Sequence, residues 1–247
     1  MGYQNLETIG SGKVMIAPTF VNVSGSVRTL ADLTVAGYEP AVEVDEDEWE
    51  GGCTGGQFFL SFLSTSGSDN GTYYWIDNGE LPAGWYASAS GKAITGGASS
   101  VPVPVGQALW TRGGGYKLVV AGAVSEDDVA FATASAGKVA TGNGTPVDLT
   151  LNKLFVTGYT PAVEVDEDEW EGGCTGGQFF LSFLKPDESD NGTYYWIDNG
   201  ELAAGWYSSA SGKAITGGAS SISVPAGQGL WTRGGGYILN VPAPELQ

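Results

Sequence analysis

Two identical stretches of the chain hold the residues that are best suited to chemistry. Residues 41–63 read AVEVDEDEWEGGCTGGQFFLSFL, and residues 162–184 repeat them letter for letter. Carboxylates at alternate positions of a strand share one face, and such oxygen ligands suit Ca²⁺. The functional interpretation of the acidic run is therefore a calcium site. Its ligands would be Glu43, Asp45 and Asp47 in the first copy and Glu164, Asp166 and Asp168 in the second.

A structural interpretation of the acidic run competes with the calcium site. Charged side chains along a strand discourage edge-to-edge pairing with other molecules, and the run lacks the spacing of an EF-hand loop. We favour this structural interpretation and expect no cofactor. Ca²⁺ at the candidate site is the one exception that the sequence leaves open. The acidic strand would then pass through the glycines at 51–52 into a central strand, Phe58–Leu63, that is buried on both faces.

The chain has two cysteines, Cys53 and Cys174, one in each copy. No disulfide can therefore close within a copy. The two residues pair with each other, pair between subunits, or remain as buried thiols, which are common because free cysteine is among the most buried residue types.

Aromatic residues form a second set that could contact a ligand. Exposed rings beside Asp77 and Asn78 would suit stacking against sugars, whereas the alternative places the rings in the core or in an interface, where aromatics are abundant. We favour core or interface positions over sugar binding. The candidate ligand or interface rings are Tyr73, Trp75 and Trp85, with Tyr194, Trp196 and Trp206 in the second copy.

Composition excludes several classes of function. The chain has no histidine, so Ser-His-Asp triads, Cys-His pairs and His-ligated zinc sites are ruled out, and we expect no enzyme. The net charge of −18 repels phosphate backbones and anionic membrane surfaces. No apolar run approaches the length of about 18 residues that a membrane-spanning helix needs. We therefore expect neither nucleic-acid binding nor membrane insertion.

An internal repeat determines the predicted organisation. Gly37–Tyr116 aligns with Gly158–Tyr237 at a constant offset of 121 residues, and a weaker match upstream places Lys13 opposite Lys138. Short runs rich in valine and aromatic residues, separated by glycine turns, predict antiparallel strands. The predicted fold class is all-β, with two tandem antiparallel β-sandwich or jelly-roll-like domains from an internal duplication. Their predicted bounds are 1–121, with an N-terminal arm or strand, and 122–247.

These features favour a non-enzymatic structural subunit of a repetitive extracellular, cell-surface or virion assembly. Such an assembly would be a filament, a surface layer, a capsid decoration or a tail component, and the main partner would be the chain itself. The N-terminal arm could then pair with the sheet edge of a neighbour. The alternative is a lectin-like protein that binds glycans at two equivalent aromatic sites.

Overall fold

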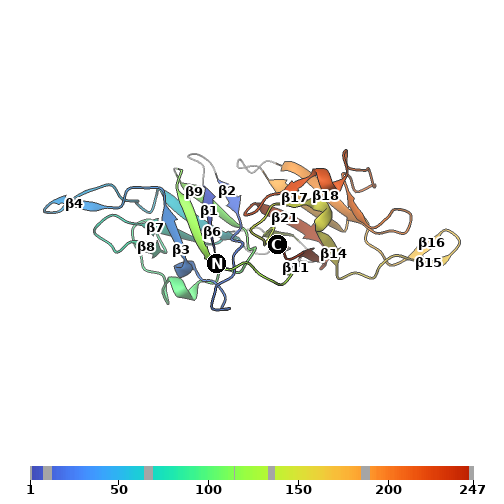
Figure 1. Cartoon of the computed structure of the whole chain (residues 1–247), viewed down its shortest axis with the longest axis horizontal. Helices are drawn as coiled ribbons and strands as arrows, with labels where there is room; N and C mark the ends of the chain where they lie inside the picture. Colours follow the sequence, from blue (N-terminus) through green and yellow to red (C-terminus); the bar gives the residue numbers. More distant parts are fainter. Residues whose placement is uncertain are drawn as a thin grey trace.

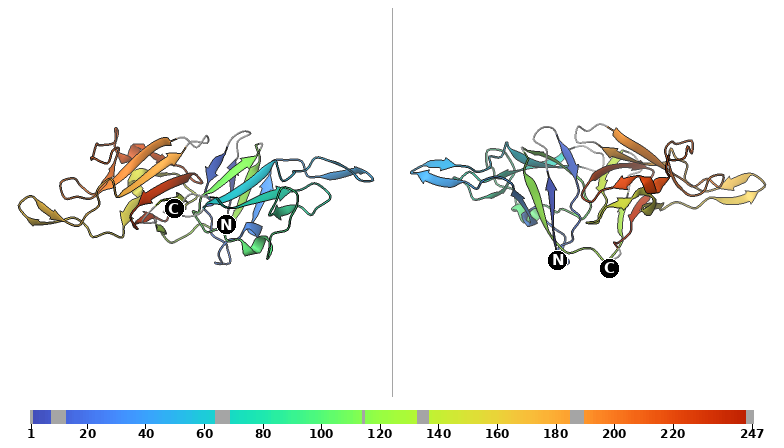
Figure 2. Two further views of the ribbon diagram at one scale, coloured as in Figure 1. Left: turned by 180° about the vertical axis from the view of Figure 1, so that it is seen from behind. Right: turned by 45° about the horizontal axis from the view of Figure 1, so that its top comes forward.

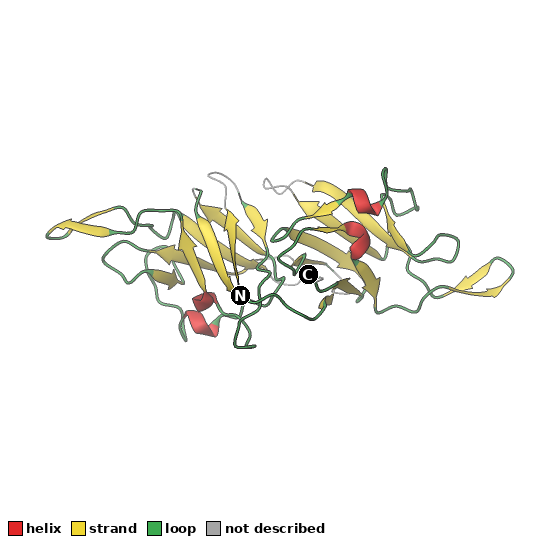
Figure 3. Ribbon diagram, in the orientation of Figure 1, coloured by secondary structure: helices red, strands yellow, loops and turns green. Residues whose placement is uncertain are grey.

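The chain folds almost entirely into β-strands. The computed structural model describes residues 2–7, 13–63, 69–113, 115–132, 137–184 and 190–244. Figure 3 shows that strands predominate in several antiparallel sheets, which confirms the all-β prediction. Within the described residues, no helix is long and apolar enough to cross a membrane. The helical segments there are short 3-10 turns: η1 (Leu30–Asp32), η2 (Ala98–Ser100), η3 (Leu151–Lys153) and η4 (Ala219–Ser221).

The described part of the N-terminal half forms three antiparallel sheets (Figure 1). Their orders are β1-β10-β3, β2-β9-β6-β7-β8 and the two-stranded β4-β5. The strands are β1 (Gly2–Glu7), β2 (Val14–Ile16), β3 (Leu33–Ala36), β4 (Val42–Asp45), β5 (Glu48–Glu50), β6 (Phe58–Leu63), β7 (Asp69–Ile76), β8 (Gly84–Tyr86), β9 (Leu109–Gly113) and β10 (Lys117–Gly122).

The C-terminal half repeats this arrangement and adds one short strand pair. Its sheet orders are β11-β22-β14, β12-β21-β17-β18-β19, β15-β16 and β13-β20. The strands are β11 (Val129–Ala132), β12 (Lys138–Gly142), β13 (Leu149–Thr150), β14 (Phe155–Thr157), β15 (Val163–Asp166), β16 (Glu169–Glu171), β17 (Phe179–Leu184), β18 (Asp190–Ile197), β19 (Gly205–Tyr207), β20 (Ser223–Val224), β21 (Gly229–Gly234) and β22 (Ile238–Val241).

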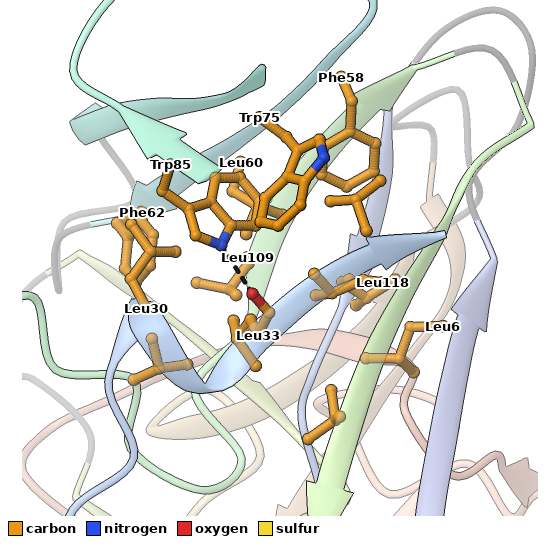
Figure 4. Close-up of a cluster of buried hydrophobic side chains, with 14 of the residues drawn as sticks. Leu6, Leu30, Leu33, Phe58, Leu60, Phe62, Trp75, Trp85, Leu109 and Leu118 are labelled. Atoms are coloured by element: carbon orange, nitrogen blue, oxygen red, sulfur yellow. Dashed lines mark hydrogen bonds between the residues drawn. The ribbon is translucent and has the colours of Figure 1, made fainter. Parts of the chain in front are cut away.

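In each half, the three-stranded and five-stranded sheets enclose a hydrophobic core, which gives a β-sandwich-like arrangement. Figure 4 shows the N-terminal core, where Leu118 of β10 and Leu33 of β3 lie across from Leu60 of β6. Strand β6 is the central strand of its sheet and keeps the predicted bounds. Its alternate residues Phe58, Leu60 and Phe62 belong to this core, as the period of two in a strand requires.

The N-terminal segment pairs within its own chain. Strand β1 is antiparallel to β10, from Gly2 opposite Gly122 to Glu7 opposite Lys117, and Leu6 contributes to the N-terminal core. This arm therefore belongs to the sheet of its own chain, and its addition to the sheet edge of a neighbouring molecule stays a prediction. The arm supplies an edge strand of the three-stranded sheet, where its leucine is buried.

The two halves contact each other reciprocally. Ile16 forms an isolated bridge with Gln228, and Gln107 forms one with Thr141. Gln107 and Gln228 occupy the same position of the repeat, and so do Ile16 and Thr141 by the upstream alignment. The contact therefore has approximate two-fold symmetry. Apolar side chains of both halves pack together there: Met15, Ala17, Leu63, Ala108, Trp110 and Trp231.

Residue sizes at this contact differ between its two sides. A side chain at Gly229 would run into Met15. At the equivalent positions of the repeat, Ala140 replaces Met15 and Ala108 replaces Gly229. The large residue therefore faces the position without a side chain.

The core packing of Trp85 generates a stability prediction. The ring is buried, its Nε1 donates to the Leu33 carbonyl at 2.8 Å, and it lies 5.9 Å from the Phe58 ring. We expect Trp85→Ala to lower the free energy of unfolding by about 3–5 kcal/mol, measured by urea denaturation. The control is Tyr86→Ala, at the adjacent and only partly buried position. This variant should lower the free energy of unfolding by clearly less. Equal losses in the two variants would contradict the assignment of Trp85 to the core.

Candidate functional site

The acidic run forms a β-hairpin, not a single strand. Strands β4 and β5 pair with Val42 opposite Glu50, Glu43 opposite Trp49 and Asp45 opposite Glu48. Asp47 lies in the turn with φ 66°, a left-handed conformation that aspartate tolerates better than most residues. The prediction that Glu43, Asp45 and Asp47 share one strand face is therefore wrong. The same correction applies to Glu164, Asp166 and Asp168, because β15 and β16 repeat this register and Asp168 has φ 65°.

A tryptophan and two glycines hold the base of the hairpin. The Trp49 ring lies so close to Gly79 that any side chain at that glycine would run into it. The Gly52 amide donates to the Glu39 carbonyl at 2.6 Å. Gly51 has φ 73° and Gly52 has φ 80°, which most other residues avoid. The hairpin therefore projects from a fixed base, and the second hairpin is held in the same way through Trp170 and Gly200.

A hydrogen-bond network continues from this base into the core. Cys53 and Asp77 exchange two backbone hydrogen bonds of 2.7 Å each. Tyr38 Oη donates to the Asp77 carboxylate at 3.1 Å and accepts from Trp75 Nε1 at 2.8 Å. Trp75 in turn packs edge-on against Trp85, with ring centroids 5.3 Å apart. The segment after the hairpin is thus connected to the centre of the sandwich-like core.

The hairpins expose apolar side chains among their charges. Figures 1 and 2 show them projecting from opposite ends of the molecule. Val42 is 54% exposed and Val44 is 46% exposed, with similar values for Val163 and Val165 in the second hairpin. Each hairpin also carries six acidic residues, so the two hairpins together hold twelve of the chain's 28 acidic residues. Each is therefore a charged projection with an apolar component.

The predicted calcium ligands are not gathered into a cluster. Among the described residues, no group of three or more Asp, Glu, Cys or His side chains is placed to hold a metal ion. The hairpin spreads its carboxylates over two strands and a turn, where they are exposed to water. Calcium binding stays a prediction that only a titration can test.

The candidate ligand aromatics lie in or against the core. Trp75 and Trp85 are buried, and Tyr73 packs edge-on against the core residue Phe62 at 5.3 Å. Burial leaves the two tryptophans unavailable for stacking against a sugar. The second copy repeats this arrangement with Tyr194, Trp196 and Trp206.

A different set of aromatic residues lies on the outer face of each five-stranded sheet. In the N-terminal half, Arg112, Phe59, Tyr74 and Tyr86 lie directly opposite one another on four adjacent strands. The corresponding residues of the C-terminal half are Lys138, Arg233, Phe180, Tyr195 and Tyr207. We call each set a basic–aromatic row. Alternation along a strand places Tyr74 on the face opposite Tyr73 and Trp75, but the sequence pattern does not show which face is outward.

The C-terminal row is adjacent to a hollow. The Arg233 guanidinium lies over the Phe180 ring, 5.8 Å from its centroid. Both residues line a hollow of about 650 Å³, together with Gln178 and Tyr237. The row therefore presents a cation and partly exposed rings next to a recess.

Both cysteines are free, buried thiols, and they lie in different cores. The Cys53 Sγ lies 3.7 Å from the Trp75 carbonyl. Burial, together with the negative charge of the Asp77 carboxylate, raises the pKa of Cys53 from 9.0 to about 11. Burial and Asp198 raise the pKa of Cys174 to about 12 in the same way. Such thiols stay protonated at neutral pH and are poor nucleophiles.

Comparison with protein-family models, curated proteins and solved structures finds no match to this chain. Inferences about function therefore rest on the geometry described above.

The buried thiols generate a pH prediction. The two thiols keep their protons to higher pH in the folded protein than in the unfolded chain. The stability that the protonated thiols contribute is therefore present below pH 9.0 and is lost as pH rises toward about 11 to 12. We expect the thermal midpoint to fall over this range, and less steeply in Cys53→Ala/Cys174→Ala. Tyr38, whose pKa burial raises to about 12, remains in both proteins. Identical pH profiles would contradict the prediction.

The calcium prediction has a direct test. An ion that binds only the folded protein raises its thermal midpoint. If the hairpins bind Ca²⁺, the midpoint should rise on titration with the ion, and Glu43→Gln/Asp45→Asn/Glu164→Gln/Asp166→Asn should remove that rise. An unchanged midpoint at millimolar Ca²⁺ would reject the calcium site.

Proposed function

We propose that this chain is a non-enzymatic structural subunit of a repetitive extracellular, cell-surface or virion assembly. The assembly would be a filament, a surface layer, a capsid decoration or a tail component. In this proposal, residues 1–121 and 122–247 are two tandem β-sandwich domains of a jelly-roll-like kind that arose by duplication. The proposal rests on one observation above all: two hairpins of identical sequence project from opposite ends of the molecule (Figure 2).

The properties of the hairpins support a role in association. Apolar side chains on a projection gain nothing from the core of their own chain, but they are favourable once a partner covers them. The fixed base lowers the entropy lost on binding, since the hairpin is already ordered. Two such projections per chain allow each molecule to contact two others, which is the requirement for an extended assembly.

Carbohydrate binding has less support than self-association. Its named tryptophans, Trp75 and Trp85, are buried, and a ring must be exposed to stack on a sugar. We therefore do not propose glycan binding as a second function.

The proposed function can be tested by the oligomeric state of the purified chain. We expect sedimentation velocity and negative-stain microscopy to show association that grows with concentration. Replacing the exposed hairpin valines with serine (Val42→Ser, Val44→Ser, Val163→Ser and Val165→Ser) should raise the concentration needed for association by about tenfold or more, as loss of central apolar contacts does at interfaces.

The matched control changes exposed valines elsewhere. Val23 is 58% exposed and Val27 is 62% exposed, and both lie outside the hairpins. We expect Val23→Ser/Val27→Ser to associate like the unmodified chain. A chain that remains monomeric at every concentration would overturn the proposed function.

A further inference from the structure

The basic–aromatic rows are the only described surface in which aligned aromatic rings and exposed arginine occur together in each half. Cross-strand neighbours lie about 4.8 Å apart, so the four residues from Arg112 to Tyr86 span about 14 Å. A four-residue strand such as β4 is about 13 Å long at about 3.3 Å per residue. A hairpin strand therefore matches a row in length.

The charges of the two surfaces are complementary. Each hairpin carries six acidic residues, whereas the rows hold Arg112, Lys138 and Arg233, three of the chain's ten basic residues. Contact between two hairpins would bring twelve carboxylates together, which is unfavourable without compensation. Contact between a hairpin and a row instead places carboxylates near guanidinium groups, which form strong charge-assisted hydrogen bonds with them.

The apolar parts of the two surfaces also fit each other. The hairpin exposes Val42 and Val44, and the row offers the rings of Phe59, Tyr74 and Tyr86, which are only partly buried. The Phe59 and Tyr74 rings are 5.7 Å apart and tilted by 49°, so they form one uneven apolar strip. Valine against aromatic rings is a favourable pairing on sheet surfaces.

A hairpin cannot dock on a row of its own chain. Figures 1 and 2 show both hairpins directed outward along the long axis, away from the sheets that carry the rows. The packing of Trp49 on Gly79 fixes this direction at the hairpin base. A hairpin that docks on a row must therefore belong to a second copy of the chain.

On these grounds we propose that the acidic hairpin of one copy docks on the basic–aromatic row of another copy, with its valines against the rings and its carboxylates near the arginine. This inference rests on the proposed function and names the two surfaces that meet. Each copy carries two hairpins and two rows, so one such contact leaves a further hairpin and a further row available, and the contact can extend from copy to copy.

The test uses two variants of the full-length chain that should each fail to associate. The row variant is Arg112→Glu/Arg233→Glu, and the hairpin variant carries serine at the four hairpin valines. Each variant keeps one of the two surfaces intact. Mixed together, they should form complexes, because the intact hairpins of the row variant can dock on the intact rows of the hairpin variant. Because each variant keeps two intact surfaces, one in each half, the complexes should contain the two variants in alternation and should grow with concentration.

The control for the row variant is Lys92→Glu/Lys213→Glu. These exposed lysines are equivalent in the repeat and lie outside the rows, so the net charge changes equally. We expect this control to associate like the unmodified chain and the row variant to need about tenfold or more higher concentration, because charge pairs across an interface can contribute that much. Circular dichroism checks that every variant is folded.

The outcomes separate the inference from the proposed function. If the row variant associates as well as the lysine control, the rows are not the docking surface, although self-assembly itself stands. If mixing the two defective variants gives no complexes, the hairpin–row contact is also rejected. If the unmodified chain is monomeric and binds a glycan array through Arg112 and Arg233, both proposals fail in favour of a glycan-binding surface.

Discussion

The position of each hairpin depends on the paired backbone hydrogen bonds between a cysteine and an aspartate. Cys53 and Asp77 join the glycine-rich segment after the hairpin to the end of β7, and Tyr38 links the same aspartate to the buried Trp75. This connection acts together with the contact of Trp49 with Gly79 and the hydrogen bond from Gly52 to Glu39, which hold the hairpin base itself. The second half repeats the network with Cys174, Asp198, Tyr159 and Trp196.

This network explains why a cysteine occurs in such a charged neighbourhood. The space at its position is closed: a side chain at Gly52 would run into the Asp77 carbonyl, and the Cys53 side chain is fully buried. A small side chain that tolerates burial is therefore required there. The acidic, glycine and cysteine residues of this stretch act together to support a projection, and their proximity in sequence reflects that architecture.

Much of the fold follows from sequence pattern, whereas the candidate surfaces do not. Strand β6 was predictable because its apolar run is bounded by turn residues, and alternation correctly separated Tyr74 from Tyr73 and Trp75. Alternation could not show which side faces water, since both sides carry aromatic rings. The hairpin was missed because its turn contains no glycine: Asp47 adopts a positive φ within a run that alternates like one strand.

The contact between the two halves has a consequence for how its sequence can vary. A homodimer must accept every substitution on both sides of its axis at once, because one gene encodes both copies. Here the two sides are separate positions in one chain, so Met15 can enlarge on one side while Gly229 removes the opposing side chain. The equivalent pair, Ala140 and Ala108, keeps intermediate sizes. Covalent linkage thus allows complementary shapes that exact symmetry would forbid.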